Sequence, residues 1–166
     1  MFSINDIVIY TTYGICKISN IKEETFLGKK ESYYVLHPLY EEKTEINLPV
    51  DNPMTKLRLC SLLSKDEIND ILNQIPFLEA YWIERDNDRK IQFADKIKSG
   101  NRLEVINVIK SILNHIEEIK NKGRKLHATD ESAMRDAEKL IVDEFSYVLE
   151  LPKEEIRIKL YEQLKK

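Results

Sequence analysis

The chain has 166 residues, of which 42% are hydrophobic and 33% charged, a composition typical of a folded globular protein and unlike that of a disordered one. No apolar run approaches the ~20 residues of a membrane-spanning helix. Residues 1–6 (MFSIND) lack the basic start and apolar stretch of a signal peptide, so we expect a cytoplasmic protein. The formal net charge is −3, but residues 82–125 carry +4, and any DNA-binding surface is therefore expected in this middle segment.

The cysteines and histidines predict neither disulfides nor a metal site. Cys16 and Cys60 are too few for a disulfide framework, and we expect both to be small buried hydrophobic residues. His37, His115 and His127 are far apart in sequence, and no Cys-x-x-Cys or His-x-x-x-His spacing accompanies them. We therefore expect no bound metal.

The first 60 residues predict β-structure, with β-branched and aromatic residues in short runs between turn residues. The predicted strands cover residues 6–11, 15–18, 33–36, 45–50 and 57–59. A hairpin turn is expected over residues 23–30, where Gly28 supplies the positive φ angle. Five short strands with tight turns indicate a small twisted barrel of the SH3 or Tudor type.

From Ser64 onward the pattern is helical. Residues 64–67 (SKDE) predict a capping box, and the helix that it opens must end before Pro76. The expected boundaries of the later helices are a cap at Asp86 or Asn87, an apolar stripe over residues 105–119, a cap at Thr129 and a start at Pro152.

Strands followed by helices in sequential blocks indicate an α+β fold. We expect a small N-terminal SH3/Tudor-like β-barrel over residues 1–63, followed by a C-terminal all-α bundle of about four or five helices over residues 64–166.

The usual signals of an active site are missing. The four glycines cannot assemble a phosphate-binding loop, and neither G-x-S-x-G nor H-E-x-x-H occurs. Because catalytic groups can also converge from distant positions, this favours a binding protein over an enzyme and leaves an unrecognised site as an alternative.

Several segments resemble the CarD/CdnL family of bacterial transcription regulators. Residues 2–10 (FSINDIVIY) and 14–18 (GICKI) resemble the family's opening pattern F-x-x-G-D-x-V-V-Y followed by G-V-G-x-I, and the likeness continues through 33–36 (YYVL) and 48–50 (LPV). The helical half is similar through the segments 82–84 (WIE), 97–102 (IKSGNR), 123–126 (GRKL) and 137–141 (AEKLI). The departures are Asn5 for a usual Gly, Thr11 for Pro and Tyr13 for His.

The resemblance implies a function without catalysis or a cofactor. The N-terminal domain, which also occurs in the transcription-repair coupling factor, would bind the RNA polymerase β subunit. The helical domain would contact promoter DNA, largely independently of sequence, at the upstream edge of the melted bubble and so stabilise the open complex. The expected state is a monomer or weak dimer. The rival interpretation is an adaptor that binds polymerase but recruits another protein through its helices.

The candidate polymerase-binding segment is the strand formed by Glu45, Ile46, Asn47, Leu48 and Pro49. Pro49 cannot donate to a β-ladder and suits an edge strand, and an exposed edge can accept a partner strand. Without the family resemblance, an ordinary edge strand with Ile46 and Leu48 in the core is the simpler interpretation.

The candidate DNA-binding residues are one aromatic residue and nine cations: Trp82, Arg85, Arg89, Lys90, Lys96, Lys98, Arg102, Lys122, Arg124 and Lys125. Cations bind phosphates without reading sequence, and an aromatic wedge can lean into the minor groove. Counted back from residues 99–100, Trp82 lies about one helical turn earlier than the family's tryptophan, where Asp86 stands; we assign Trp82 because it is the only tryptophan. The alternatives are a half-buried core tryptophan and a solvated helix face in which interleaved acids pair with the cations.

Overall fold

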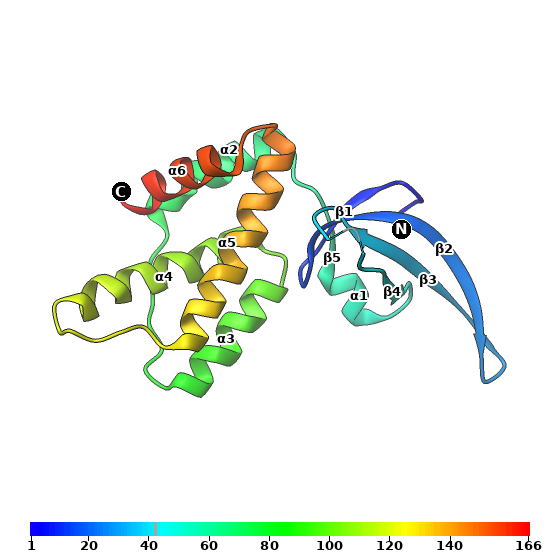
Figure 1. Cartoon of the computed structure of the whole chain (residues 1–166), viewed down its shortest axis with the longest axis horizontal. Helices are drawn as coiled ribbons and strands as arrows, with labels where there is room; N and C mark the ends of the chain where they lie inside the picture. Colours follow the sequence, from blue (N-terminus) through cyan, green and yellow to red (C-terminus); the bar gives the residue numbers. More distant parts are fainter. Residues whose placement is uncertain (42) are drawn as a thin grey trace. The chain divides into compact units, whose positions relative to one another are not determined.

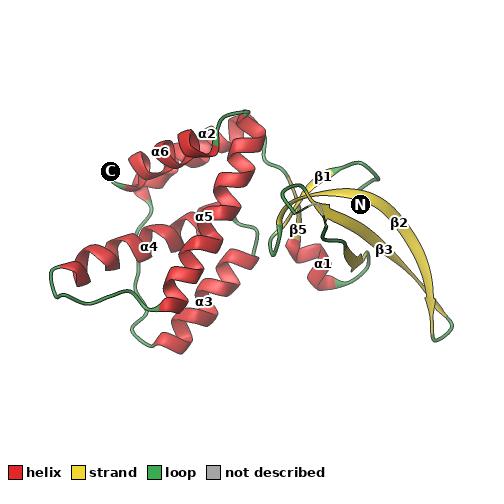
Figure 2. Ribbon diagram, viewed as in Figure 1, coloured by secondary structure: helices red, strands yellow, loops and turns green. Residues whose placement is uncertain are grey.

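The computed structural model describes residues 1–41 and 43–166 and divides into two compact units, Met1–Leu62 and Leu63–Lys166. The first unit is an antiparallel sheet with one short helix, and the second consists of helices (Figures 1 and 2). The predicted α+β fold is therefore confirmed. No described helix is both long enough and apolar enough to cross a membrane.

The sheet has five strands in the order β4-β3-β2-β1-β5. Their bounds are β1 Ile7–Tyr10, β2 Gly14–Phe26, β3 Lys29–Pro38, β4 Ile46–Pro49 and β5 Leu59–Ser61. All neighbouring strands are antiparallel. The predicted closure into a barrel is wrong: β4 and β5 are the two edges and do not pair with each other in the described part of the chain. The chain between them forms a helix and does not continue the sheet.

That helix, α1 (Pro53–Arg58), replaces part of the strand predicted over residues 57–59. Asn52 caps it by accepting a hydrogen bond from the Met54 N–H at 2.8 Å, and Pro53 occupies the first helical position, where a missing N–H costs nothing. The last strand, β5, consequently starts only at Leu59.

The long β2–β3 hairpin arches away from the other strands and ends in a tight turn (Figure 1). Leu27 and Gly28 both have positive φ, 49° and 78°, which suits the right-handed twist of the flanking strands. Asn5, which stands where the resemblance expects Gly, has φ 75°. Asparagine is one of the few residues that tolerate this left-handed conformation, so the substitution preserves the opening turn.

One core cluster of the sheet unit lies on the face of the sheet that α1 and the N-terminus cover. Its buried residues are Val8, Cys16, Ile18, Tyr34, Leu36, Val50 and Leu59. Cys16 is fully buried, as expected, whereas Cys60 in β5 is partly exposed; both are free thiols. Burial raises the pKa of the Cys16 thiol to about 12.

The second unit contains five α-helices and a short 3₁₀ segment. They are α2 Lys65–Gln74, the 3₁₀ segment η1 Ile75–Phe77, α3 Asp86–Lys98, α4 Arg102–Lys120, α5 Ala128–Leu149 and α6 Lys153–Leu164. The predicted capping box at Ser64 is present: its hydroxyl accepts from the Glu67 N–H, and the Glu67 carboxylate accepts from the Ser64 N–H. Two predicted caps are displaced: Arg85 and His127 occupy the N-cap positions of α3 and α5, and neither side chain makes a capping hydrogen bond.

The core of the helical unit forms around α4 and α5. Of the apolar stripe predicted in α4, Val105, Ile109 and Ile112 are completely buried and Ile119 is buried, whereas Ile116 is partly exposed. The helix α5 packs against α3, α4 and α6, so it is the central helix of the unit. Charged side chains are buried beside this core as well, and two of them, Arg89 and Arg102, belong to the predicted site.

Candidate functional site

The strand β4 is an edge strand, as the sequence predicts. It pairs only with β3, in the register Tyr34 opposite Leu48 and Leu36 opposite Ile46, and no described residue pairs with its other side. Such an edge leaves backbone N–H and C=O groups available to a further strand.

The backbone alternation identifies which groups of β4 are available. The Val50 N–H donates to the Ser32 carbonyl at 2.8 Å, so the paired residues two and four positions earlier, Leu48 and Ile46, also direct their backbone groups toward β3. Asn47 and Pro49 then direct theirs outward. Pro49 has no N–H, which leaves Asn47 as the residue of β4 that offers both an amide and a carbonyl to a partner.

The side chains of β4 divide between core and solvent. Ile46 and Leu48 pack against the core cluster, as predicted, and Asn47 is exposed on the opposite face. Glu45, just before the strand, is exposed, and its carboxylate lies 3.9 Å from the His37 imidazole. The Asn47 amide donates to the Glu45 carboxylate at 3.4 Å.

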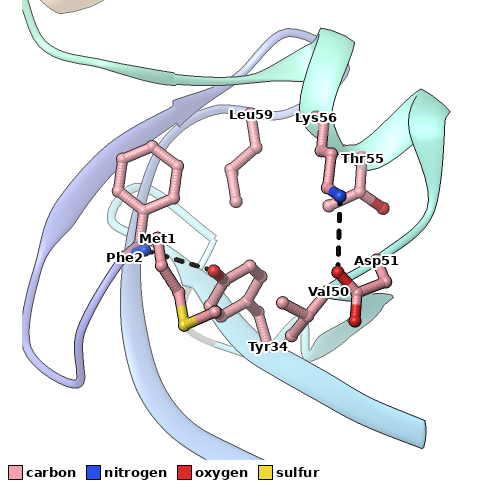
Figure 3. Close-up of a pocket in the computed structure, with 8 residues that line it drawn as sticks. All are labelled: Met1, Phe2, Tyr34, Val50, Asp51, Thr55, Lys56 and Leu59. Atoms are coloured by element: carbon pink, nitrogen blue, oxygen red, sulfur yellow. Dashed lines mark hydrogen bonds and ion pairs between the residues drawn. The ribbon is translucent and has the colours of Figure 1, made fainter.

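A cavity of about 380 Å³ lies next to the end of β4. Val50 and Asp51, which follow the strand, line it together with Tyr34, Leu59 and residues of the N-terminus and α1 (Figure 3). Its walls are about equally polar and apolar. Its charged side chains, Asp51 and Lys56, form an ion pair at 3.3 Å on one side of the cavity (Figure 3), so it lacks the converging ionisable groups of an active site.

In the helical unit, Trp82 precedes α3 and is half-buried. Its indole stacks on the His115 imidazole of α4, with ring centroids 3.6 Å apart, and packs edge-on against Phe93. The Arg89 guanidinium lies over the same indole, 4.3 Å from its centroid. The faces of the ring are therefore engaged within the unit, and only part of the indole remains accessible to a ligand.

Arg89 is interior and belongs to the scaffold of this region. The residue is 1% exposed, and its side chain binds both carboxylate oxygens of Asp130 in α5, at 2.8 and 2.9 Å. It also donates to the Asp86 carboxylate and to the Ile83 carbonyl, at 2.8 and 2.6 Å. The bond to Asp130 raises the pKa of the guanidinium, and the bond from Arg89 lowers the pKa of Asp86. We therefore leave Arg89 out of the proposed DNA-binding surface.

Arg102 is interior too and is left out for the same reason. It is 8% exposed and binds Glu144 of α5 through two bonds of 2.8 Å. Lys96 is partly exposed, forms an ion pair with Glu104 and lies 4.7 Å from the centroid of the Tyr81 ring. Lys98 is exposed at the C-terminal end of α3, whereas Trp82 precedes the N-terminus of that helix and contacts its middle at Phe93.

The remaining predicted cations are exposed, and we call them the basic set: Arg85, Lys90, Lys122, Arg124 and Lys125. Arg85 and Lys90 lie at the start of α3, near Trp82, and the other three lie in the loop that joins α4 to α5. That loop ends at His127, whose imidazole is 3.9 Å from the Asp86 carboxylate at the start of α3. The helices α3 and α5 thus begin at the same end of the unit (Figure 1).

One acidic residue reduces the positive charge of this surface, and one further cation adds to it. Asp88 lies 3.5 Å from Arg85 and partly neutralises it, as the interleaved acids predicted. Lys120, exposed at the end of α4, adds a cation that sequence reasoning missed. Its membership of a basic run, KNKGRK over residues 120–125, was a readable signal. Within the described ranges, no cluster of three or more His, Cys, Asp or Glu side chains could hold a metal ion.

Comparison with known proteins identifies both units. A family profile described as "CarD-like/TRCF RID domain" matches residues 2–59, which include β4, and one described as "CarD, C-terminal domain" matches residues 82–161, beginning at Trp82. The curated relatives include "Putative transcription factor YdeB" of Bacillus subtilis (strain 168), which is 22% identical over 95% of this chain and 98% of its own length. The resemblance seen in the sequence is confirmed: the chain belongs to the CarD family of transcription regulators, whose N-terminal domain is an RNA polymerase-interacting domain.

Proposed function

We propose that this protein binds the RNA polymerase β subunit through the open edge of β4 and stabilises the open promoter complex by contacting DNA through its helical unit. It acts as an adaptor, without catalysis or a cofactor. The observation that carries the proposal is the unpaired outer side of β4 in a domain of the polymerase-interacting family.

The polymerase contact is strand addition. A segment of the β subunit pairs with the Asn47 amide and carbonyl, and these main-chain bonds supply affinity. In β4, Asn47 alone offers both an amide and a carbonyl, so the ladder is short and side-chain contacts must contribute to the affinity as well. A side chain of the same segment enters the cavity beside Val50, because that cavity begins where β4 ends.

The DNA contact is made by the basic set around the accessible part of Trp82. The cations bind phosphates near the bubble's upstream edge, and the indole leans against the distorted base step there. Because His115 and Arg89 hold the ring, Trp82 is presented in a fixed orientation. A preference of about 1.4 kcal/mol for melted over duplex DNA shifts the opening equilibrium tenfold.

A second candidate function is an adaptor that binds polymerase and recruits another protein without touching DNA. The burial of Arg89 and Arg102 favours it, since both cations are lost from the DNA surface. Salt dependence discriminates the two functions, because phosphate contacts release counterions and a protein contact of mixed charge does not.

The test is to measure binding of the purified full chain to the isolated β-subunit lobe of its own polymerase, and then to a promoter fragment with a preformed bubble at several salt concentrations. We expect binding to the lobe and salt-dependent binding to the bubble. If the chain binds the lobe but shows no salt-dependent DNA binding, the second function replaces the first. If it does not bind the lobe, both are wrong.

A further inference from the structure

The first residue of the helical unit, Leu63, is tied by its backbone to a buried carboxylate. The Leu63 N–H donates to Glu144 Oε1 of α5 at 3.0 Å, across 81 positions of sequence. Leu63 lies in the connection between β5, which ends at Ser61, and α2, which begins at Lys65. Glu144 therefore fixes the connecting segment at the point where it joins the helices.

The Glu144 carboxylate is itself held in place. It is completely buried, and Arg102 donates to both of its oxygens at 2.8 Å. Arg102 is oriented in turn by a 2.6 Å bond to the Gly100 carbonyl before α4. A buried carboxylate requires a partner of this kind, because an unpaired charge in the interior is strongly unfavourable. The ion pair thus holds the Glu144 oxygen beside the Leu63 amide.

The adjacent residue of α5 offers a comparison. Asp143 is also buried, 3% exposed, and it pairs with Lys153 of α6 at 2.7 Å. Two consecutive carboxylates of one helix therefore have different partners, and it is Glu144 that holds the connecting segment.

We propose that Glu144, positioned by Arg102, anchors the connection between the two units through its hydrogen bond to the Leu63 N–H. This anchor keeps the tether, the chain between the end of β5 and Leu63, short while both units are bound. The inference rests on the proposed function, since its effect requires one unit on polymerase and the other on DNA. With Leu63 fixed, one residue, Leu62, lies between the end of β5 at Ser61 and the anchor. Releasing Leu63 lengthens and loosens that tether, which lowers the effective concentration of the second unit at its site.

The test compares two double variants of the full chain. Arg102→Leu/Glu144→Leu removes the anchor and fills its space with apolar side chains, a change that buried ion pairs commonly tolerate. Asp143→Leu/Lys153→Leu is the matched control, since it removes the neighbouring pair and leaves Leu63 bonded. Circular dichroism checks that both are folded; if the first is not, Arg102→Met/Glu144→Met replaces it, because methionine also lacks the acceptor for the Leu63 N–H and its flexible side chain fills irregular space.

The first measurement is amide hydrogen exchange at Leu63, expected to be about tenfold faster in the anchor variant and unchanged in the control. The second is the lifetime of the promoter open complex with polymerase, expected to fall about two- to threefold in the anchor variant alone, because one more residue joins the connection. Affinities for the isolated β-subunit lobe and for DNA should stay at the wild-type values.

If the anchor variant shows wild-type amide exchange at Leu63, or a wild-type open-complex lifetime, the proposal that Glu144 anchors the connection is wrong. An equal loss of lifetime in the control would also overturn it, because general destabilisation would then explain the effect. If the wild-type chain fails to bind the lobe, the proposed function is wrong, and the exchange measurement still decides whether Glu144 holds Leu63.

Discussion

Replacing Asn47 with proline is the sharpest perturbation of the proposed polymerase contact. Proline removes the outward N–H of β4 and places a ring where a partner strand would lie, while the β3–β4 ladder keeps its bonds, because Leu48 and Ile46 make them. The preceding residue, Ile46, is already in a strand, the conformation that proline requires of it. The sheet unit should therefore stay folded.

The magnitude follows from the hydrogen bond that is lost. A partner carbonyl that is buried at the interface without a donor costs about 1–3 kcal/mol, which corresponds to roughly 5- to 150-fold weaker binding. Isothermal titration calorimetry against the isolated β-subunit lobe measures it directly. Asn47→Ala is the control, since it keeps the amide and removes the side chain, and its affinity should stay within about twofold of the wild-type value.

Two results would refute this reasoning. Wild-type affinity of a folded Asn47→Pro variant would mean that the polymerase does not pair with β4. An equal loss in Asn47→Ala and Asn47→Pro would mean that the side chain is recognised and the backbone is not.

Three further predictions concern the interior and the basic set. Asp130→Ala leaves Arg89 buried without its main partner, and urea unfolding should show a loss of about 3–5 kcal/mol. Lys122→Glu/Arg124→Glu should weaken DNA binding and reduce the slope of log K against log salt by about two, or more if the new acids repel phosphates. Because the folded Cys16 thiol has a pKa of about 12, against 9.0 for an unperturbed thiol, it stays neutral where the unfolded thiol ionises. Between pH 9 and 12 this group should lower the free energy of unfolding by about 1.4 kcal/mol per pH unit, and Cys16→Ala should remove that contribution.

Each of these has its own control. Lys29→Glu/Lys30→Glu reverses two exposed cations at the β2–β3 turn and should leave the DNA salt slope unchanged. Arg89→Leu/Asp130→Leu should recover most of the stability lost in Asp130→Ala; failure to recover it would show that the pair has a role beyond charge compensation. For Cys16, equal slopes of stability against pH in wild type and variant would contradict the prediction.

Local signals in the sequence predicted much of the fold. The capping box at Ser64 and the apolar spacing of α4 depend on neighbouring residues and were confirmed. The helix α1 was missed although Asn52 and Pro53 are a standard cap and first residue, because the β-branched and apolar residues around them outweighed that signal. Closure of the sheet depends on distant strands meeting, which short-range patterns do not encode.

The candidate site was harder to predict, because the charge of a side chain does not tell whether it points to solvent or into the core. Arg89 was assigned to DNA, yet Phe93 and Ile97 follow it at four and eight residues, so the helical period already places it on the buried face of α3. Its partner Asp130 is 41 positions away, and no local pattern connects the two. The edge position of β4 was predictable because Pro49 has no N–H to donate to a second neighbouring strand.

The stacking of Trp82 on His115 also has a spectroscopic consequence. Trp82 is the only tryptophan of the chain, and it lies in the helical unit between an imidazole and a guanidinium, both of which contact the indole closely. Tryptophan fluorescence therefore reports on the helical unit alone, while the five tyrosines of the sheet unit contribute only tyrosine emission. Selective excitation of the indole should resolve the melting of one unit from that of the other in the intact protein, without an introduced label.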